Sequence, residues 1–298
     1  MKHQEIRGLW LGLLGVLIFS ITFPMTRLAV GTEQAPLMSG MFVACGRAVV
    51  AAGLSLLYLI GCRAPVPERT HWPALGLVAG GVVFGFPILS SMALQHVEAV
   101  HASVITGLMP LATALLGALL NRQRPSMGFW ICALLGSLMV AVFALMRSGH
   151  SDLAWDTADL WLVAAMGCGA VGYAWGGRLS THMPAQHVIC WALVLSLPIT
   201  LPLAWTYRPT TPMPVSAWLG FAYAAVFSMW LGFFAWYRGL AIGGTVRVSQ
   251  TQLLQPFLSM MFSIPILGEQ VDVLTLGFGM AIVGTVFLSR KMPVHAQA

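Results

Sequence analysis

The side chains best suited to recognise a small molecule form a polar stripe in the segment 246–267. Ser249, Gln252, Pro256, Ser259 and Ser263 follow one another at steps of three or four residues, which places them on one face of a helix. Polar groups are costly toward lipid, so this face is expected to point inward. The stripe predicts either a pathway for a polar solute or a close helix contact held by small side chains.

The same stripe occurs earlier in the chain. The positions 146 residues before it are again polar, small or proline: Ser103, Thr106, Pro110, Thr113 and Gly117. Because a packing contact needs no such recurrence, the matched stripes favour a central pathway. Gln252 and its neighbour Gln255 are its strongest members, since a buried carboxamide needs partners for both its donor and its acceptor atoms.

A second stripe is aromatic and lies in the segment 216–240. Its members are Tyr223, Phe227, Trp230, Phe234 and Tyr237. Shifted back by 146 residues, Trp230 and Phe234 fall on Phe84 and Ile88. Aromatic faces in membrane helices touch lipid or core more often than substrate. If this face meets the polar stripe, the two enclose an apolar cavity with a few hydrogen-bonding groups, which suits small amphipathic or aromatic metabolites.

Two ionisable residues within apolar segments could also take part. Arg47 is the one charge well inside such a segment, where an unpaired charge is costly. It either donates to backbone carbonyls as a structural arginine or contacts a substrate carboxylate. His101 is a second functional candidate. All nine acidic residues lie in loops or at segment ends, which predicts facilitated export down a gradient rather than obligatory ion exchange.

Other chemistry is disfavoured by what the chain lacks. The five cysteines form no Cys-x-x-Cys pair and the eight histidines have no metal-ligand spacing. No P-loop, His-Glu-x-x-His or Gly-x-Ser-x-Gly motif occurs. The sequence therefore predicts no enzyme activity, no cofactor and no metal site.

The composition is that of a membrane protein, with 58% hydrophobic and 8% charged residues, against about 25% charge in a soluble domain. A helix needs about 20 apolar residues to cross the hydrocarbon core. The predicted fold is therefore an all-α integral membrane protein in the lipid bilayer. Its ten expected spans are 8–30, 37–61, 73–94, 100–121, 127–147, 159–180, 186–206, 216–240, 246–267 and 271–290.

The two halves of the chain repeat each other. Leu9-Trp10-Leu11 returns as Leu160-Trp161-Leu162 at a spacing of 151 residues, and Leu108 returns as Leu254 at a spacing of 146. The predicted repeats are residues 1–150 and 151–298, each with five spans, which together form one membrane domain. Because five is odd, the second repeat should be inverted in the membrane, as in many secondary transporters.

Basic residues give the orientation, because Lys and Arg are retained on the cytoplasmic side. With the N-terminus inside, the outer segment ends hold only Arg27, Arg147 and Arg208. Both termini are then expected in the cytoplasm of a bacterium, with the chain crossing the inner membrane. The net charge of +6 follows from this bias and requires no nucleic-acid partner. The inner loops and tails hold Lys2, Arg7, Arg63, Arg69, Arg122, Arg124, Arg178, Arg238, Arg247, Arg290 and Lys291.

Several short motifs resemble those of a known family. Leu240-Ala241 through Ser249, then Gln255-Pro256, then Leu267-Gly268-Glu269, resemble the second repeat of EamA-type proteins of the drug/metabolite transporter superfamily. Phe19-Ser20-Ile21-Thr22-Phe23 is similar to that family's first-span stretch Trp-Gly-Ser-x-Phe. The first repeat departs from the pattern, since Arg122-Gln123 stands where Gly-Glu is expected.

Within the superfamily the chain most resembles the bacterial aromatic amino-acid exporters of the YddG group. That resemblance implies a ten-helix exporter of amino acids, aromatic and other neutral ones, that works by alternating access. It also implies a central cavity between spans 1, 3, 4, 6, 8 and 9. The implied lining residues are Phe19, Phe23, Phe84, Ile88, Thr106, Pro110, Tyr173, Trp230, Phe234, Ser249, Gln252 and Pro256.

Two alternatives stay open. The chain could export another solute, such as a nucleoside or a toxic cation, although a cation site would normally use a buried carboxylate. It could also be a membrane-embedded enzyme or an assembly protein, although convergent His, Asp, Glu or Cys groups are lacking within the spans.

Overall fold

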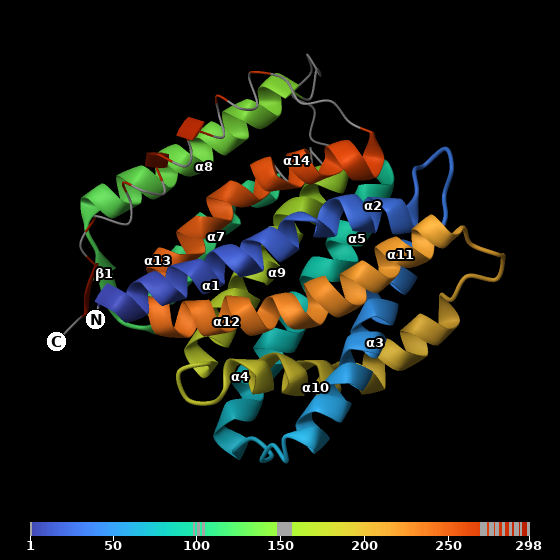
Figure 1. Cartoon of the computed structure of the whole chain (residues 1–298), viewed down its shortest axis with the longest axis horizontal. Coiled ribbons are helices and arrows are strands. Elements are labelled where there is room, and N and C mark those ends of the chain that lie inside the picture. The colour runs from blue at the N-terminus through green and yellow to red at the C-terminus, as the bar shows by residue number, and fades with distance from the viewer. Residues whose placement is uncertain are drawn as a thin grey trace.

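The computed structural model describes residues 2–97, 99, 102, 105–147 and 157–268, with isolated positions and a short strand beyond them. This part of the chain is almost entirely helical, and its helices pack side by side (Figure 1). In the first half the elements are α1 (Lys2–Ser20), α2 (Thr22–Val30), α3 (Gly40–Gly61), η1 (Arg69–His71), α4 (Trp72–Val78), η2 (Ala79–Gly85), α5 (Phe86–His96), η3 (Thr106–Leu108), α7 (Met109–Leu120), β1 (Gln123–Pro125) and α8 (Met127–Arg147).

The second half repeats much of this order. Its elements are α9 (Thr157–Leu179), α10 (Ala185–Thr206), α11 (Val215–Tyr223), η4 (Ala224–Leu231), α12 (Gly232–Gly243), α13 (Thr245–Ser249), η5 (Gln250–Leu254), α14 (Gln255–Leu267) and β2 (Val294–Ala296).

Six of the expected spans are helices long and apolar enough to cross a membrane. Two more, Thr106–Leu120 and Met127–Met139, are apolar but shorter. The segment 246–267 is built from α13, η5 and α14 in succession, and the expected span 271–290 lies almost wholly outside the described residues. The helical membrane architecture is confirmed, whereas the count of ten spans stays a prediction. The six long helices are Gln4–Val30, Gly40–Gly61, Arg69–His96, Thr157–Leu179, Ala185–Thr206 and Val215–Gly243.

Irregular helical turns recur at matching positions in the two halves. A π-helix, which is rare in proteins, forms at η2 and again at η4, and an offset of 146 residues places Ala79–Gly85 on residues 225–231. A 3₁₀ turn, η3 or η5, likewise precedes each of the helices that open with Pro110 and Pro256. Proline lacks the N–H of the α-helical ladder, which accounts for the turn of different pitch before it.

Helix contacts also match between the halves. α1 packs along α12, as Figure 1 shows, and α9 packs along η2 and α5. α3 packs along α10, and α7 contacts α13. Small residues permit the closest approaches: a Cβ placed on Gly8 would lie 2.4 Å from the Cα of Gly243, and one on Gly81 would lie 2.4 Å from the carbonyl oxygen of Cys168.

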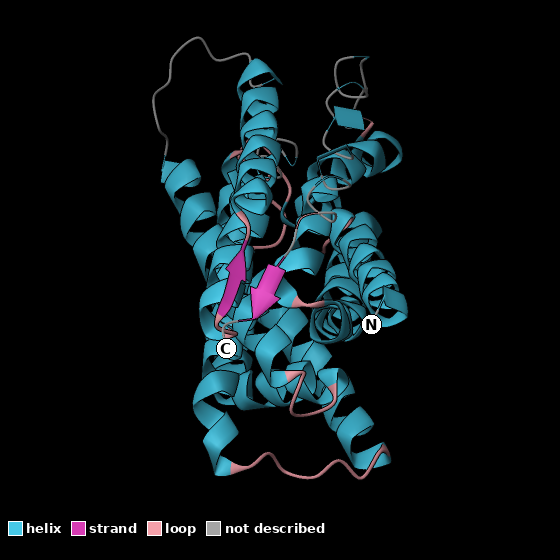
Figure 2. Cartoon of the chain, turned by 90° about the vertical axis from the view of Figure 1, so that its left-hand side faces the viewer, coloured by secondary structure: helices cyan, strands magenta, loops and turns pink. Residues whose placement is uncertain are grey.

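A two-stranded ribbon joins distant parts of the sequence. β1 pairs antiparallel with β2, so that Gln123 lies opposite Ala296. The ribbon and the start of α1 lie at the same end of the molecule (Figures 1 and 2). The side of the membrane that this end of the molecule faces stays a prediction.

Candidate functional site

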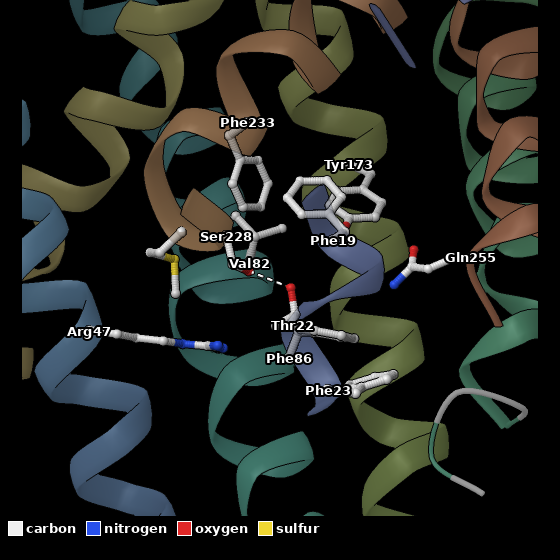
Figure 3. Close-up of a pocket in the computed structure, with 11 residues that line it drawn as sticks. Phe19, Thr22, Phe23, Arg47, Val82, Phe86, Tyr173, Ser228, Phe233 and Gln255 are labelled. Carbon is white, nitrogen blue, oxygen red and sulfur yellow. Dashed lines mark hydrogen bonds between the residues drawn. The ribbon is translucent and has the colours of Figure 1, made fainter. Parts of the chain in front are cut away.

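A narrow cavity lies where the first, second, third, sixth, eighth and ninth expected spans meet (Figure 3). Its free volume is about 20 Å³, which is room for about one water molecule. A metabolite can enter only after the surrounding helices separate. The lining residues are Phe19, Thr22, Phe23, Arg47, Val82, Phe86, Tyr173, Ser228, Met229, Phe233 and Gln255.

The first span is interrupted directly before two of the lining residues, Thr22 and Phe23. The helical hydrogen-bond ladder is interrupted at Ile21, between α1 and α2, although the backbone of Ile21 stays in the right-handed region at φ −82° and ψ −12°. Carbonyl oxygens freed near the break accept hydrogen bonds from other spans, at 2.9 Å from the Tyr223 hydroxyl to Ile18 and at 2.7 Å from the Ser259 hydroxyl to Ser20. Because these bonds satisfy the open backbone, the break is stable, and Thr22 follows it directly.

A hydrogen bond between the two halves crosses one wall of the cavity. The Thr22 hydroxyl donates to the Ser228 hydroxyl at 2.8 Å, and both side chains are buried. Gln255 approaches the same space from the first turn of α14, on another side of the cavity (Figure 3). With the hydroxyl-bearing Tyr173 of α9, the neutral polar residues of the site therefore come from α2, η4, α9 and α14.

Arg47 is the charged group of the site. Its side chain is only 2% exposed, and its guanidinium points from α3 toward Thr22 and Phe86 (Figure 3). The Nε atom has no hydrogen-bond partner. Among the described residues, the ion pairs of Glu33 with His96 and of Glu5 with Arg247 do not involve it. A buried cation without an anion is costly, so the position is suited to a ligand that brings the missing negative charge.

Aromatic rings form most of the remaining wall. Phe19 stacks on Tyr173 with centroids 6.2 Å apart and contacts Phe233 at 5.1 Å. Phe23 stacks on Phe86 at 6.2 Å. Such rings give a large apolar contact area with defined geometry. The arrangement can hold an apolar or aromatic body while one end of the ligand meets Arg47.

Three of the predicted lining residues lie at this cavity, namely Phe19, Phe23 and Tyr173. Gln252 is buried one turn before Gln255, and its Nε2 atom lies 3.9 Å from the Sδ atom of Met109. Its Oε1 atom has no partner. It therefore sits behind the wall rather than in it.

Four more predicted residues lie in or beside the 3₁₀ turns η3 and η5. The Thr106 hydroxyl donates to the carbonyl of Ala102 at 2.8 Å, and the Ser249 hydroxyl donates to the carbonyl of Val246 at 3.0 Å. Pro110 and Pro256 are buried at the first turns of α7 and α14. These four residues shape the helices and do not line the cavity.

The aromatic stripe does not form a single face. Trp230 and Phe234 contact each other at 5.0 Å and surround Tyr58 of α3 at 6.3 and 5.4 Å. Their neighbours Met229 and Phe233 line the cavity instead. The π-helix η4 runs through the stripe, and its wider turn changes the register that an α-helical spacing assumes.

The same register change separates Phe84 and Ile88 from the cavity. Both are partly buried, whereas Val82 and Phe86 contribute its wall on this side. His101 and Ser103 lie outside the described residues.

Sequence reasoning missed several lining residues, among them Thr22, Ser228 and Phe86. A signal existed for Ser228, because it is the one Ser or Thr in the interior of the apolar stretch 217–240. Thr22 also had one, since it lies in the first-span motif. For Phe86 the sequence offered nothing that distinguishes it from the other phenylalanines.

The helices and the buried cavity define the chain as a polytopic membrane protein of transporter type. The EamA-like transporter family profile matches residues 6–145 and again 156–290. The chain therefore belongs to the EamA-like transporter family, within the drug/metabolite transporter superfamily, and is a multi-pass membrane transporter embedded in the lipid bilayer. The double match confirms the family resemblance seen in the motifs.

Individual relatives agree with this assignment. The chain is 43% identical over 282 residues to "Uncharacterized transporter YdeK" of Bacillus subtilis (strain 168), covering 94% of this chain and 96% of that protein. It is 24% identical over 278 residues to "Uncharacterized transporter sll0355" of Synechocystis sp., covering 86% and 83%. A solved crystal structure superposes with a TM-score of 0.73 at 16% identity, covering 95% of this chain and 98% of the other, which supports the fold alone.

Proposed function

We propose that this transporter exports amino acids, aromatic and other neutral ones, and related small metabolites across the bacterial inner membrane by alternating access. The observation that carries the proposal is the cavity itself, where Arg47, which has no ion-pair partner among the described residues, faces a wall of aromatic rings. A guanidinium binds carboxylate oxygens through charge-assisted hydrogen bonds, and the rings fit an apolar side chain. The motif resemblance to the YddG group of aromatic amino-acid exporters agrees with this substrate class.

Equivalent positions of the two halves meet at the cavity, which supports a mechanism based on two inverted five-helix repeats. An offset of 151 residues relates Thr22 to Tyr173, and an offset of 146 relates Val82 to Ser228; all four line the cavity. A site on the axis between two inverted repeats can be opened to either side by rocking one repeat against the other. Its small free volume corresponds to a conformation between the two open ones.

The cavity also bears on the alternative substrates. A toxic cation would meet Arg47 and no acidic lining residue, which disfavours that alternative. A nucleoside would use the rings and the polar groups of Thr22, Ser228 and Gln255 but would leave Arg47 unpaired. The lining residues offer no group of nucleophile and base for an enzyme.

The test is efflux of a panel of radiolabelled amino acids and nucleosides from proteoliposomes containing only the purified chain. We expect aromatic and branched neutral amino acids to leave faster than from protein-free liposomes, and nucleosides to leave at the protein-free rate. Export of none of the amino acids would contradict the proposal, and nucleoside efflux alone would replace it.

A further inference from the structure

The charge of the cavity wall is unbalanced. Arg47 supplies one positive charge, and the other lining residues are apolar, aromatic or neutral polar. An amino acid brings two charges, a carboxylate and an ammonium. Only the carboxylate finds an opposite charge in the described cavity.

The ammonium would be poorly placed there. In a medium of low dielectric the guanidinium attracts a carboxylate and repels a second cation, and an ammonium that leaves water loses its hydration. The neutral acceptors are few: the hydroxyls of Thr22 and Ser228, which are hydrogen-bonded to each other at 2.8 Å but keep free lone pairs, the Tyr173 hydroxyl and the Gln255 amide. None of these groups carries a negative charge that would offset the repulsion of an ammonium by Arg47.

Aromatic rings can also hold a cation over their faces, but in this cavity the faces lie beside a fixed positive charge. Phe19 and Tyr173 are nearly parallel, at 13°, with centroids 6.2 Å apart, so the two rings are offset and part of each face stays uncovered by the other. Phe23 and Phe86 are stacked at 28°. A cation over either pair would share the cavity with the Arg47 guanidinium.

We propose that the site recognises a carboxylate anion and does not require an ammonium. Aromatic and branched monocarboxylates without the amine, such as arylpropanoates and 2-oxo acids, bind at least as tightly as the amino acids with the same skeleton. This inference rests on the proposed function of a small-metabolite exporter and changes its preferred substrate from a zwitterion to a monoanion.

Three ligands with one skeleton test this charge preference: phenylalanine, 3-phenylpropanoate, which lacks the ammonium, and phenethylamine, which lacks the carboxylate. Binding of each to the purified full chain is measured by isothermal titration at neutral pH. Efflux of radiolabelled phenylalanine from proteoliposomes is measured in parallel, with the other two as unlabelled competitors. We expect 3-phenylpropanoate to bind and compete at least as well as phenylalanine, and phenethylamine to be at least tenfold weaker than both.

Variants of Arg47 link the preference to the cavity. Arg47→Gln should weaken 3-phenylpropanoate at least tenfold, whereas Arg47→Lys, which keeps the charge, should preserve the order of the three ligands. Ser55→Ala is the matched control, because Ser55 is buried in the same helix α3 but does not line the cavity. It should leave all three affinities unchanged.

The outcomes separate the two proposals. If phenylalanine is exported but binds tenfold more tightly than 3-phenylpropanoate, or phenethylamine binds as well as either, the monoanion preference is wrong and the export function stands. If 3-phenylpropanoate alone binds and phenylalanine is not exported, the preference stands and the amino-acid function falls. If no ligand binds and no flux occurs, both are wrong. Should Arg47→Gln fail to accumulate, the ligand series on the unaltered chain still decides.

Discussion

Helices α3 and α10 occupy equivalent places in the two halves, yet only one of them carries a charge. Both contain 22 residues, and an offset of 145 aligns Gly40–Gly61 with Ala185–Thr206, so that Arg47 falls on Ala192. The two helices pack against each other, and both positions are buried. Arg47 points into the cavity, whereas Ala192 belongs to the apolar core.

The difference shows which features the two halves of the chain share and which they do not. The π-helices and the 3₁₀ turns before proline recur in both halves, and they concern the backbone. The lining side chains at equivalent positions differ, as with Val82 and Ser228. Similar backbone features in the two halves therefore surround a cavity whose side chains differ from one half to the other.

Replacing the charged member of the α3 and α10 pair should have the largest effect. Arg47→Gln removes a charge-assisted hydrogen bond worth about 1.5–3 kcal/mol, which corresponds to roughly a 10- to 150-fold loss of transport. Initial efflux rates of phenylalanine at matched membrane levels measure it. Full activity with reduced protein levels would instead assign Arg47 a structural role.

Two aromatic residues in and just after the π-helix η4, Trp230 and Phe233, have different neighbours. Phe233 contacts Phe19 at the cavity, whereas Trp230 contacts Tyr58 of α3. Phe233→Leu should remove a ring contact of about 0.5–1.5 kcal/mol and reduce transport of aromatic substrates about two- to tenfold. Trp230→Leu should change it less. If Trp230→Leu loses more transport than Phe233→Leu while both variants have equal thermal stability, Trp230 contacts the substrate, as the α-helical spacing predicts.

Helical spacing was a reliable guide to burial and a poor guide to the cavity wall. The polar stripe of 249–263 is buried as expected, because burial depends on which face avoids lipid. The wall depends on single positions, and the wider turn of a π-helix changes which positions share a face. The apolar sequence of residues 79–85 contains no signal that predicts a π-helix. Phe19, Phe23 and Tyr173, which the resemblance to the YddG group implied, lie in regular α-helix and at the cavity.

The two hydroxyl groups that join the halves should matter less than the charge. Ser228→Ala removes the acceptor of the Thr22 hydrogen bond, and a neutral hydrogen bond contributes about 0.5–1.5 kcal/mol. We expect a two- to tenfold rise in the KM for phenylalanine. Ser196→Ala in α10 is the control, since the Ser196 hydroxyl donates to the carbonyl of Leu193 within its own helix and does not line the cavity. An equal effect of both changes would mean that the Thr22 bond has no part in binding.

The smallest expected effect is that of an imposed pH difference. Proton-driven transporters commonly place Asp or Glu inside the membrane, where protonation can be tied to substrate occupancy, but the described residues that line this cavity include neither. Arg47 stays charged across the physiological range, because an arginine side chain is effectively always protonated. In proteoliposomes without an ion gradient, downhill efflux of phenylalanine should be fast, and a pH step should change its initial rate less than twofold. Accumulation of phenylalanine against its own gradient under a pH difference would contradict this expectation. Loss of that accumulation in His101→Ala would then identify the coupling group, and its persistence would direct the search to the acidic residues at the span ends.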